Sequence, residues 1–223
     1  SFAQVFLNLI DITLPMVEIG SKYKIGTRRF GLINWIGACA LYKKEVLRFL
    51  IVWAQTIFSP LISALLFLLV LSLAIGNERG DVLGVSFINF LAPGLIAMQV
   101  IQQSFSHSSS SFMIGKIQGN IVDILYAPLS AAEVTLAVTL AAVSRSVIIA
   151  FVSIVTFYFI IDFEIKNYFT LIAFTFLSSF ILGALGMVAG LWAEKFDHMA
   201  TATNFVIVPL SFLSGTFYTI DKL

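Results

Sequence analysis

Long apolar runs are the feature that most constrains how this chain can fold. They cover residues 49–75, 86 to about 105, 134–161 and 168–193, and a fifth begins near 199 and reaches 209–215. A helix needs about 20 such residues to cross the hydrocarbon of a bilayer, whereas a transmembrane β-strand needs about ten residues of alternating polarity. The runs therefore predict an all-α, polytopic membrane protein with about five visible transmembrane helices.

Composition indicates that lipid is the main solvent of the surface. Hydrophobic residues make up 59% of the chain and charged residues 11%, whereas a soluble domain usually has about 25% charged residues. A net charge of +1 gives no reason to expect nucleic acid as a partner. One cysteine and two widely separated histidines allow no disulfide framework and predict no metal site.

Basic residues predict the orientation of the chain. Those that precede the first apolar run are Lys22, Lys24, Arg28, Arg29, Lys43, Lys44 and Arg48. The next polar turn carries Arg79, which is balanced by Glu78 and Asp81. Because Lys and Arg concentrate on the cytoplasmic side, we expect a cytoplasmic N-terminus. Inner segments then follow at 108–133 and 194–198, and outer turns at 76–85 and 162–167.

Two further segments precede the first apolar run. Residues 1–30 are expected to form a peripheral or disordered extension. Residues 35–48 have the pattern of an amphipathic interfacial helix, with one set of side chains at the lipid headgroups and another dipping inward. The first set is Lys43, Lys44 and Arg48, and the second is Trp35, Ile36, Leu41 and Leu47. A soluble linker is the alternative interpretation.

The inner segment 115–130 also has helical periodicity. Its apolar positions are Ile117, Ile121, Ile124 and Leu125, with Lys116, Gln118, Asn120 and Asp123 elsewhere around the helix. Pro128 is expected to end this helix and Ser130 to cap the next one. The helix could lie flat under the membrane or dock in a groove of a partner, and the pattern by itself favours the first interpretation.

Two features stand out within the apolar runs. Arg145 lies inside the third run, where a charge faces either a partner or a wet path, or extends to the membrane interface. The length of this run favours extension to the inner interface. In the fourth run, Gly186 and Gly190 form a Gly-x-x-x-Gly motif, preceded by Gly183, and indicate close helix packing.

The sequence carries no recognisable enzyme motif. Nucleophile-elbow, zinc-protease and P-loop patterns are absent from the sequence. Candidate acids and bases such as Asp123, Glu133 and Glu194 lie in predicted loops or at helix ends and form no paired constellation. A function that uses ATP would therefore require a second protein.

Four stretches in order resemble the ABC-2 membrane family, and specifically its bacterial multidrug or polysaccharide-type export permeases. They are residues 41–49 with 53–56, residues 90–96, residues 120–130 with Glu133, and residues 209–218. The resemblance runs from about Phe30 to the end, so that residues 31–223 are expected to form one transmembrane domain. The family pattern continues to a sixth span, and the chain is expected to lack this last span.

The resemblance implies a permease subunit of an ABC exporter in the bacterial inner membrane. It implies a homodimer, a separate cytoplasmic ABC ATPase that binds the ATP, and no cofactor bound by this chain. The implied ATPase-coupling residues are Gly115, Lys116, Ile117, Gln118, Gly119, Asn120, Ile121, Asp123, Ile124, Leu125 and Tyr126. The implied connecting helix includes Trp35, Lys43, Lys44, Glu45 and Arg48, and the implied signature of the fifth span includes Pro209, Leu213, Ser214, Gly215 and Phe217.

Two other classes of function remain open from the sequence. A membrane anchor or assembly subunit would use the same helices without transporting anything. A membrane-embedded enzyme would need clusters of ionisable residues in its spans, and Arg145 is the one such residue that stands well inside a run. Drugs, lipids and lipid-linked glycans are all compatible with the apolar, phenylalanine-rich composition.

Overall fold

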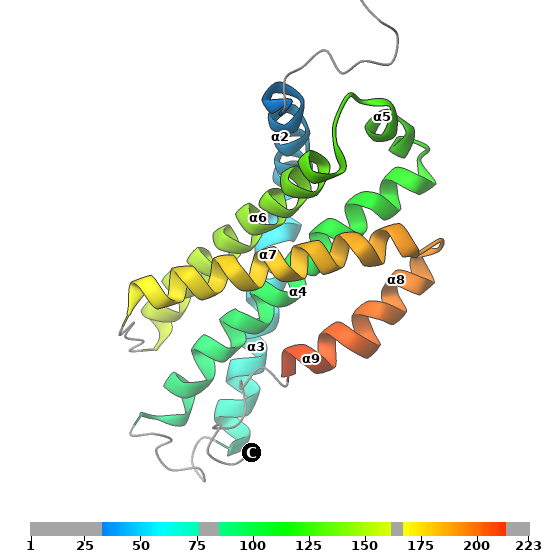
Figure 1. Ribbon diagram of the computed structural model, residues 1–223. Helices are drawn as coiled ribbons and strands as arrows, with labels where there is room; N and C mark the ends of the chain where they lie inside the picture. The colour runs from blue at the N-terminus through cyan, green and yellow to red at the C-terminus, as the bar shows by residue number, and fades with distance from the viewer. Residues whose placement is uncertain (1–32, 76–84, 162–166, 213–223) are drawn as a thin grey trace, which may run out of the picture. The chain divides into compact units, whose positions relative to one another are not determined.

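The computed structural model describes residues 33–75, 85–161 and 167–212, and this part of the chain is helical without β-strands (Figure 1). The all-α expectation is confirmed. Three helices are long and apolar enough to cross a membrane, namely Trp53–Ala74, Ala131–Ile160 and Tyr168–Trp192. The larger number of spans and the extension at 1–30 remain predictions, and the extension lies outside the described residues.

The helices follow the predicted runs closely, with one clear exception. Their bounds are α2 Trp35–Ile51, α3 Trp53–Ile75, α4 Phe87–Ile117, α5 Ile121–Tyr126, α6 Ala131–Ile160, α7 Tyr168–Trp192, α8 Phe196–Ala202, the π-helix η1 Thr203–Ile207 and α9 Val208–Phe212. The last three elements continue directly into one another. The exception is α4, which extends well past the end of its apolar run.

Helix α4 continues through a stretch that the sequence assigns to an inner loop. The prediction that a loop starts at Ser108 is wrong, because residues 105–117 are helical and Ser108 and Ser109 are fully buried. Serines can remain in a buried helix by bonding to their own backbone. Ser109 and Ser110 donate to the carbonyl oxygens of Ser106 and His107, at 3.4 and 3.0 Å. Because serine is hydrophilic, hydropathy predicts that these residues are exposed, whereas other parts of the protein cover them in the structure.

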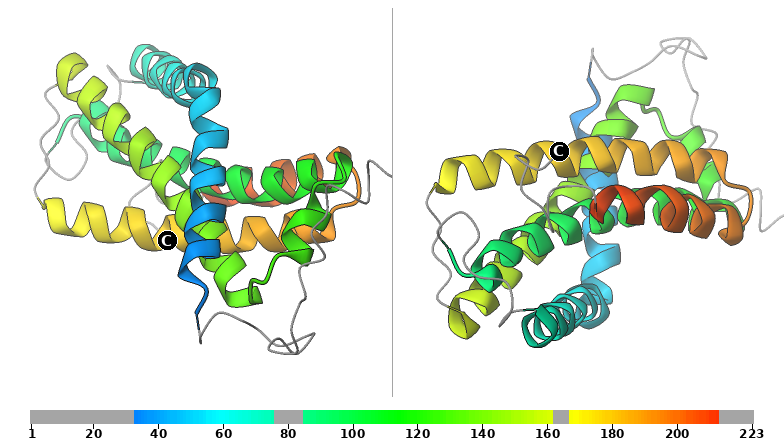
Figure 2. Two further views of the ribbon diagram at one scale, coloured as in Figure 1. Left: turned by 90° about the horizontal axis from the view of Figure 1, so that it is seen from above. Right: turned by 90° about the horizontal axis from the view of Figure 1, so that it is seen from below.

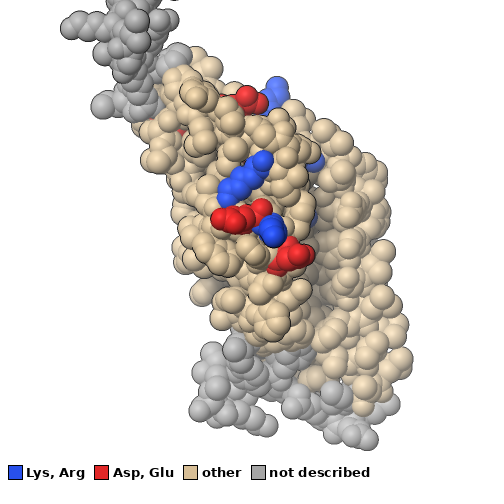
Figure 3. Space-filling view, turned by 90° about the vertical axis from the view of Figure 1, so that its right-hand side faces the viewer, with Lys and Arg blue, Asp and Glu red and all other residues tan. Residues whose placement is uncertain are grey.

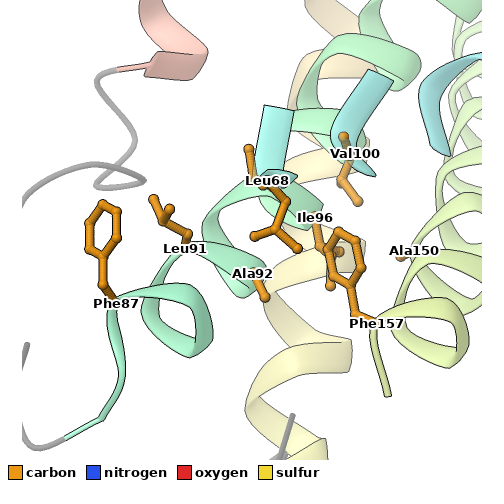
Figure 4. Packing of buried hydrophobic residues seen from close by; sticks show 10 residues of the cluster. Leu68, Phe87, Leu91, Ala92, Ile96, Val100, Ala150 and Phe157 are labelled. Carbon is orange, nitrogen blue, oxygen red and sulfur yellow. The ribbon is translucent and has the colours of Figure 1, made fainter. Parts of the chain in front are cut away.

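Helix α4 is the element around which the others pack. It contacts α7, α6, α3 and α9, and both views in Figure 2 show it running between α3 and α7. Towards the Phe87 end, a cluster of apolar side chains joins α3, α4 and α6. Figure 4 shows this cluster, with Leu68 of α3, Leu91 and Ile96 of α4, and Phe157 of α6. The other half of α4 is polar, and its polar groups are described below.

Glycines bring α7 into backbone contact with the polar half of α4. A Cβ atom on Gly186 would lie 3.0 Å from the Cα of Phe105, and one on Gly190 would lie 2.6 Å from the carbonyl oxygen of Ser109. Gly183 has more room, since its nearest neighbour is the Cβ of Ala142 at 3.2 Å. Small residues allow two membrane helices to approach this closely, so the separation of α4 and α7 depends on Gly186 and Gly190.

Replacing either glycine by alanine should destabilise the fold. We expect Gly186→Ala and Gly190→Ala each to cost about 1–3 kcal/mol, because the added methyl group meets backbone atoms that have nowhere to move. The measurement is the thermal melting of the detergent-purified protein. Gly115→Ala is the matched control, because its Cβ would have its nearest neighbour at an ordinary 3.7 Å. Melting of both α7 variants at the wild-type temperature would contradict this packing.

Candidate functional site

The inner segment between α4 and α6 is two pieces rather than one continuous helix. Helix α4 ends at Ile117, and α5 begins at Ile121 after a turn in which Gly119 has φ +76°. This left-handed conformation suits glycine and breaks a helix. The prediction of one continuous helix from Ile117 to Leu125 is therefore wrong. Helix α5 itself is present, and Pro128 follows its end at Tyr126 as expected.

The apolar residues of α5 divide between two sides. Ile121 and Ile124 are half-buried against a cluster that contains Leu41 of α2 and Phe112 of α4. Leu125 and Tyr126 are 74% and 86% exposed. Val122 and Asp123 are exposed as well. One side of α5 thus attaches to the helical bundle, and the other side offers apolar groups that nothing in the described residues covers.

The start of α6 fixes the position of this segment. Ser130 caps α6 as the sequence predicts, and it forms a capping box with Glu133. The Glu133 carboxylate also accepts a hydrogen bond from the backbone N–H of Asn34, at 2.5 Å. Asn34 in turn caps α2 and donates its side-chain amide to the Pro128 carbonyl oxygen at 3.2 Å. The beginning of α2 is therefore tied to the chain between α5 and α6.

The side chains of α2 are distributed differently from the predicted interfacial pattern. Trp35, Ile36 and Leu47 are exposed, but Leu41 is buried inside the bundle. Lys43 and Lys44 are exposed as expected, whereas Glu45 is fully buried. A signal for this burial exists in the sequence, because Glu45 lies four residues from both Leu41 and Phe49 and so shares their helix face. Whether the exposed residues lie in the membrane interface remains a prediction.

A buried ionic cluster joins α2 to α4. Arg48 donates from Nε to the Glu45 carboxylate at 3.0 Å and from its terminal nitrogen to the His107 carbonyl oxygen at 2.9 Å. The His107 ring is fully buried, with Nε2 at 3.8 Å from the same carboxylate. A buried charge is tolerated when it is paired and hydrogen-bonded. The cluster therefore holds α2 against the polar half of α4.

A row of glutamines on α4 connects it to the other long helices. Gln99 donates to the Pro60 carbonyl oxygen of α3 and accepts from Ser153 of α6, both at 2.8 Å. Gln102 donates to Ser211 of α9 at 2.9 Å. Gln103 accepts a hydrogen bond from Arg145 at 2.6 Å. The structure thus places the Arg145 guanidinium against α4, in contrast to the favoured interpretation that it extends to the inner interface.

The glutamine row borders a cavity of about 240 Å³ between α3, α4 and α9. Its wall combines apolar side chains such as Phe67 and Met98 with polar groups such as Ser59 and Gln102. An apolar pocket with a few polar groups is the usual form of a small-molecule site. These residues were not predicted from the sequence, although glutamines at three- and four-residue spacing inside an apolar run indicate one polar face on a membrane helix.

The remaining predicted residues are only partly covered by the structure. Gln118, Gly119 and Asn120 form the exposed turn before α5. Pro209 lies in α9, whereas Leu213, Ser214, Gly215 and Phe217 are outside the described residues. Among the residues described, no group of His, Cys, Asp and Glu could hold a metal ion.

Removing the carboxylate of the ionic cluster should be costly. In Glu45→Ala, the Arg48 guanidinium remains packed without its anion, and we expect a loss of about 3 kcal/mol of stability. Glu45→Gln should lose less, because its amide oxygen can still accept from Arg48. Lys43→Ala changes a nearby exposed charge and serves as the control. The readout is thermal melting in detergent, and a Glu45→Ala protein as stable as the control would disprove the role assigned to the cluster.

Comparison with known proteins identifies the family. The family model described as "ABC-2 type transporter" matches residues 37–223. The inner membrane transport permease YadH of Escherichia coli K12 is 30% identical over 192 residues, which is 86% of this chain and 75% of that protein. Nodulation protein J of Neorhizobium galegae is 26% identical over 197 residues, covering 86% of this chain and 73% of that protein. No solved structure matches the chain.

The match covers most of the chain and includes every helix from α3 to α9. The helical architecture and the apolar spans fit the membrane location that the name of the relative YadH states. The chain belongs to the ABC-2 type transporter family and is a membrane permease subunit of an ABC transporter.

Proposed function

We propose that this chain is the membrane-spanning subunit of an ATP-driven exporter and that it works as a homodimer on a separate cytoplasmic ABC ATPase. In this proposal the ATPase binds and hydrolyses ATP, and the permease chain binds no cofactor of its own. Family membership supports the ATPase partner. The export direction rests on the resemblance of residues 120–130 and 209–218 to export permeases.

The observation that carries the proposal is the exposed side of α5. Its apolar side chains Leu125 and Tyr126 lie beside the exposed polar residues Gln118, Asn120 and Asp123. Transfer of the polar side chains from water into hydrocarbon would be costly, so the hydrocarbon of the membrane does not cover their apolar neighbours. Apolar groups presented in this setting typically mark a protein interface. The ATPase is the proposed occupant of this surface.

The attachment of α5 gives a route from the ATPase to the membrane helices. Ile121 and Ile124 pack into the cluster formed by α2, α4 and α6, and the link between Glu133 and Asn34 ties the following segment to α2. A displacement of α5 would therefore move several long helices together. Helices packed in this way change position by discrete rigid-body shifts, as alternating access to a substrate path requires.

The cavity between α3, α4 and α9 is the proposed part of the substrate path within one subunit. Its mixture of aromatic and amide groups accommodates an apolar body with hydrogen-bonding groups. A drug, a lipid and a lipid-linked glycan all meet this description. The cytoplasmic placement of the N-terminus is supported by the exposed Lys43 and Lys44 on α2.

Placing charges on the outer side of α5 should weaken ATPase binding. We expect the double variant Leu125→Asp/Tyr126→Asp to lose the ATPase in co-purification of the complete complex, with affinity at least about tenfold lower, because two apolar contacts become buried charges. Its melting temperature should stay near that of the wild type, since both side chains are exposed.

The matched control is Ala132→Asp, which adds a negative charge at an exposed position in the first turn of α6, outside the docking residues of α5. It should retain the ATPase. Retention of the ATPase by the double variant would exclude α5 as the docking element and favour the alternative in which α5 only lies under the membrane. A wild-type chain that retains no ABC ATPase would instead favour an anchor or assembly subunit.

A further inference from the structure

Lys116 connects the ends of α4 and α7. It lies in the last turn of α4, and its ammonium donates hydrogen bonds to the carbonyl oxygens of Leu191 and Ala193, the second at 2.9 Å. Leu191 belongs to the last turn of α7 and Ala193 is its C-cap. Carbonyls at a helix C-terminus lack partners within the helix, and a lysine there satisfies them and complements the helix dipole. Lys116 thus caps α7 from a neighbouring helix.

The backbone of Lys116 forms a hydrogen bond on the side of α5. Its carbonyl oxygen accepts a hydrogen bond from the N–H of Gly119, at 3.2 Å, in the turn that leads to α5. The same residue therefore contacts the α5 side through its backbone and the α7 side through its side chain. About two helical turns before Lys116 along α4, the two helices α4 and α7 are already in backbone contact at Ser109 and Gly190.

The chain beyond Ala193 leads back to the cavity. After the 193–195 elbow it continues as α8, η1 and α9. In α9, Ser211 receives the hydrogen bond from Gln102 beside the cavity. A π-helix such as η1 is a frequent feature of functional sites. The elbow thus stands between the inner segment and the wall of the cavity.

The elbow also lies on a hydrophilic side of the molecule. Figure 3, which looks from the side where α4 and α7 end, shows acidic and basic side chains gathered on an otherwise uncharged surface. The charged residues of the elbow and the start of α8, Glu194, Lys195 and Asp197, are all exposed. Water rather than lipid is therefore the favourable surrounding for these side chains.

We propose that Lys116 is a positioning residue that links α5 to the α7–α8 elbow, so that a movement of α5 reaches α8, α9 and the cavity. This inference rests on the proposed function, because it takes the ATPase as the source of the movement. It also separates Lys116 from the docking residues of the inner segment. The exposed side of α5 binds the partner, whereas the Lys116 ammonium contacts the end of α7 and carries the displacement to a second pair of helices.

The test follows α5 and α8 separately in the full-length permease purified with its ABC ATPase. The exposed Cys39 is first changed to serine, and a single reporter cysteine is introduced at Val122 in α5 or at Ala200 in α8, both exposed. The rate of reaction with fluorescein maleimide is measured without nucleotide and with ATP and vanadate. In the chain that keeps Lys116 we expect nucleotide to change the rate about threefold or more at both sites.

Lys116→Met should abolish the change at Ala200 and leave the change at Val122. Lys116→Arg should restore the change at Ala200, because a guanidinium can also donate to two carbonyls. Lys195→Met is the matched control, since Lys195 is an exposed lysine of the same elbow and its ammonium has no bond within the described residues. It should preserve both responses.

The outcomes separate the inference from the proposed function. A response at Ala200 that survives in Lys116→Met would show that Lys116 only caps α7, and would overturn the inference even if the melting temperature falls. If Lys116→Met does not fold, Lys116→Ala, which also removes every side-chain donor, takes its place with the same criterion. Loss of the ATPase, or no response at Val122 in the chain that keeps Lys116, would overturn the proposed function and the inference together.

Discussion

The burial of polar side chains along α4 is the constraint on which the rest of the structure depends. Lipid cannot satisfy glutamines, serines, a histidine and their charged neighbours, so protein has to cover them. Helix α7 covers one side by a backbone contact at Gly186 and Gly190, and α6 and α3 bond to Gln99 from two directions. Helix α2 adds the cluster around Glu45. The arrangement of the helices follows from these requirements.

The bundle therefore has two halves with different mechanical properties. The half towards Phe87 is held mainly by apolar contacts such as those of Leu91 and Phe157, which are non-directional, with Gln99 as a hydrogen-bonded exception. The half towards Ile117 combines an apolar cluster with more directional bonds, such as those of Arg48 and Lys116. The inner segment attaches to this second half through Ile121, Glu133 and Lys116. A movement of a partner ATPase would therefore reach the half of the bundle whose hydrogen bonds can rearrange in discrete steps.

The sequence predicted the parts that depend on local rules and missed those that depend on tertiary pairing. Apolar runs predicted most of the helices, and the Ser130 cap was predicted from its position before an apolar run. The extension of α4 past Phe105 was missed because hydropathy treats a serine as exposed, whatever it bonds to. The break at Gly119 was missed because isoleucine spacing suggested one helix. The bond from Glu133 to Asn34 spans 99 residues and has no local signal.

Helix α4 continues as a buried helix through Ser109, and the exposed inner segment begins only after its end at Ile117. Cysteine accessibility in inside-out vesicles tests it most directly, in the Cys39→Ser background, with single cysteines at Ser109 or Leu125 and a membrane-impermeant maleimide. We expect rapid labelling at Leu125, which is 74% exposed, and almost none at Ser109, which is 1% exposed. Equal labelling at the two positions would contradict it.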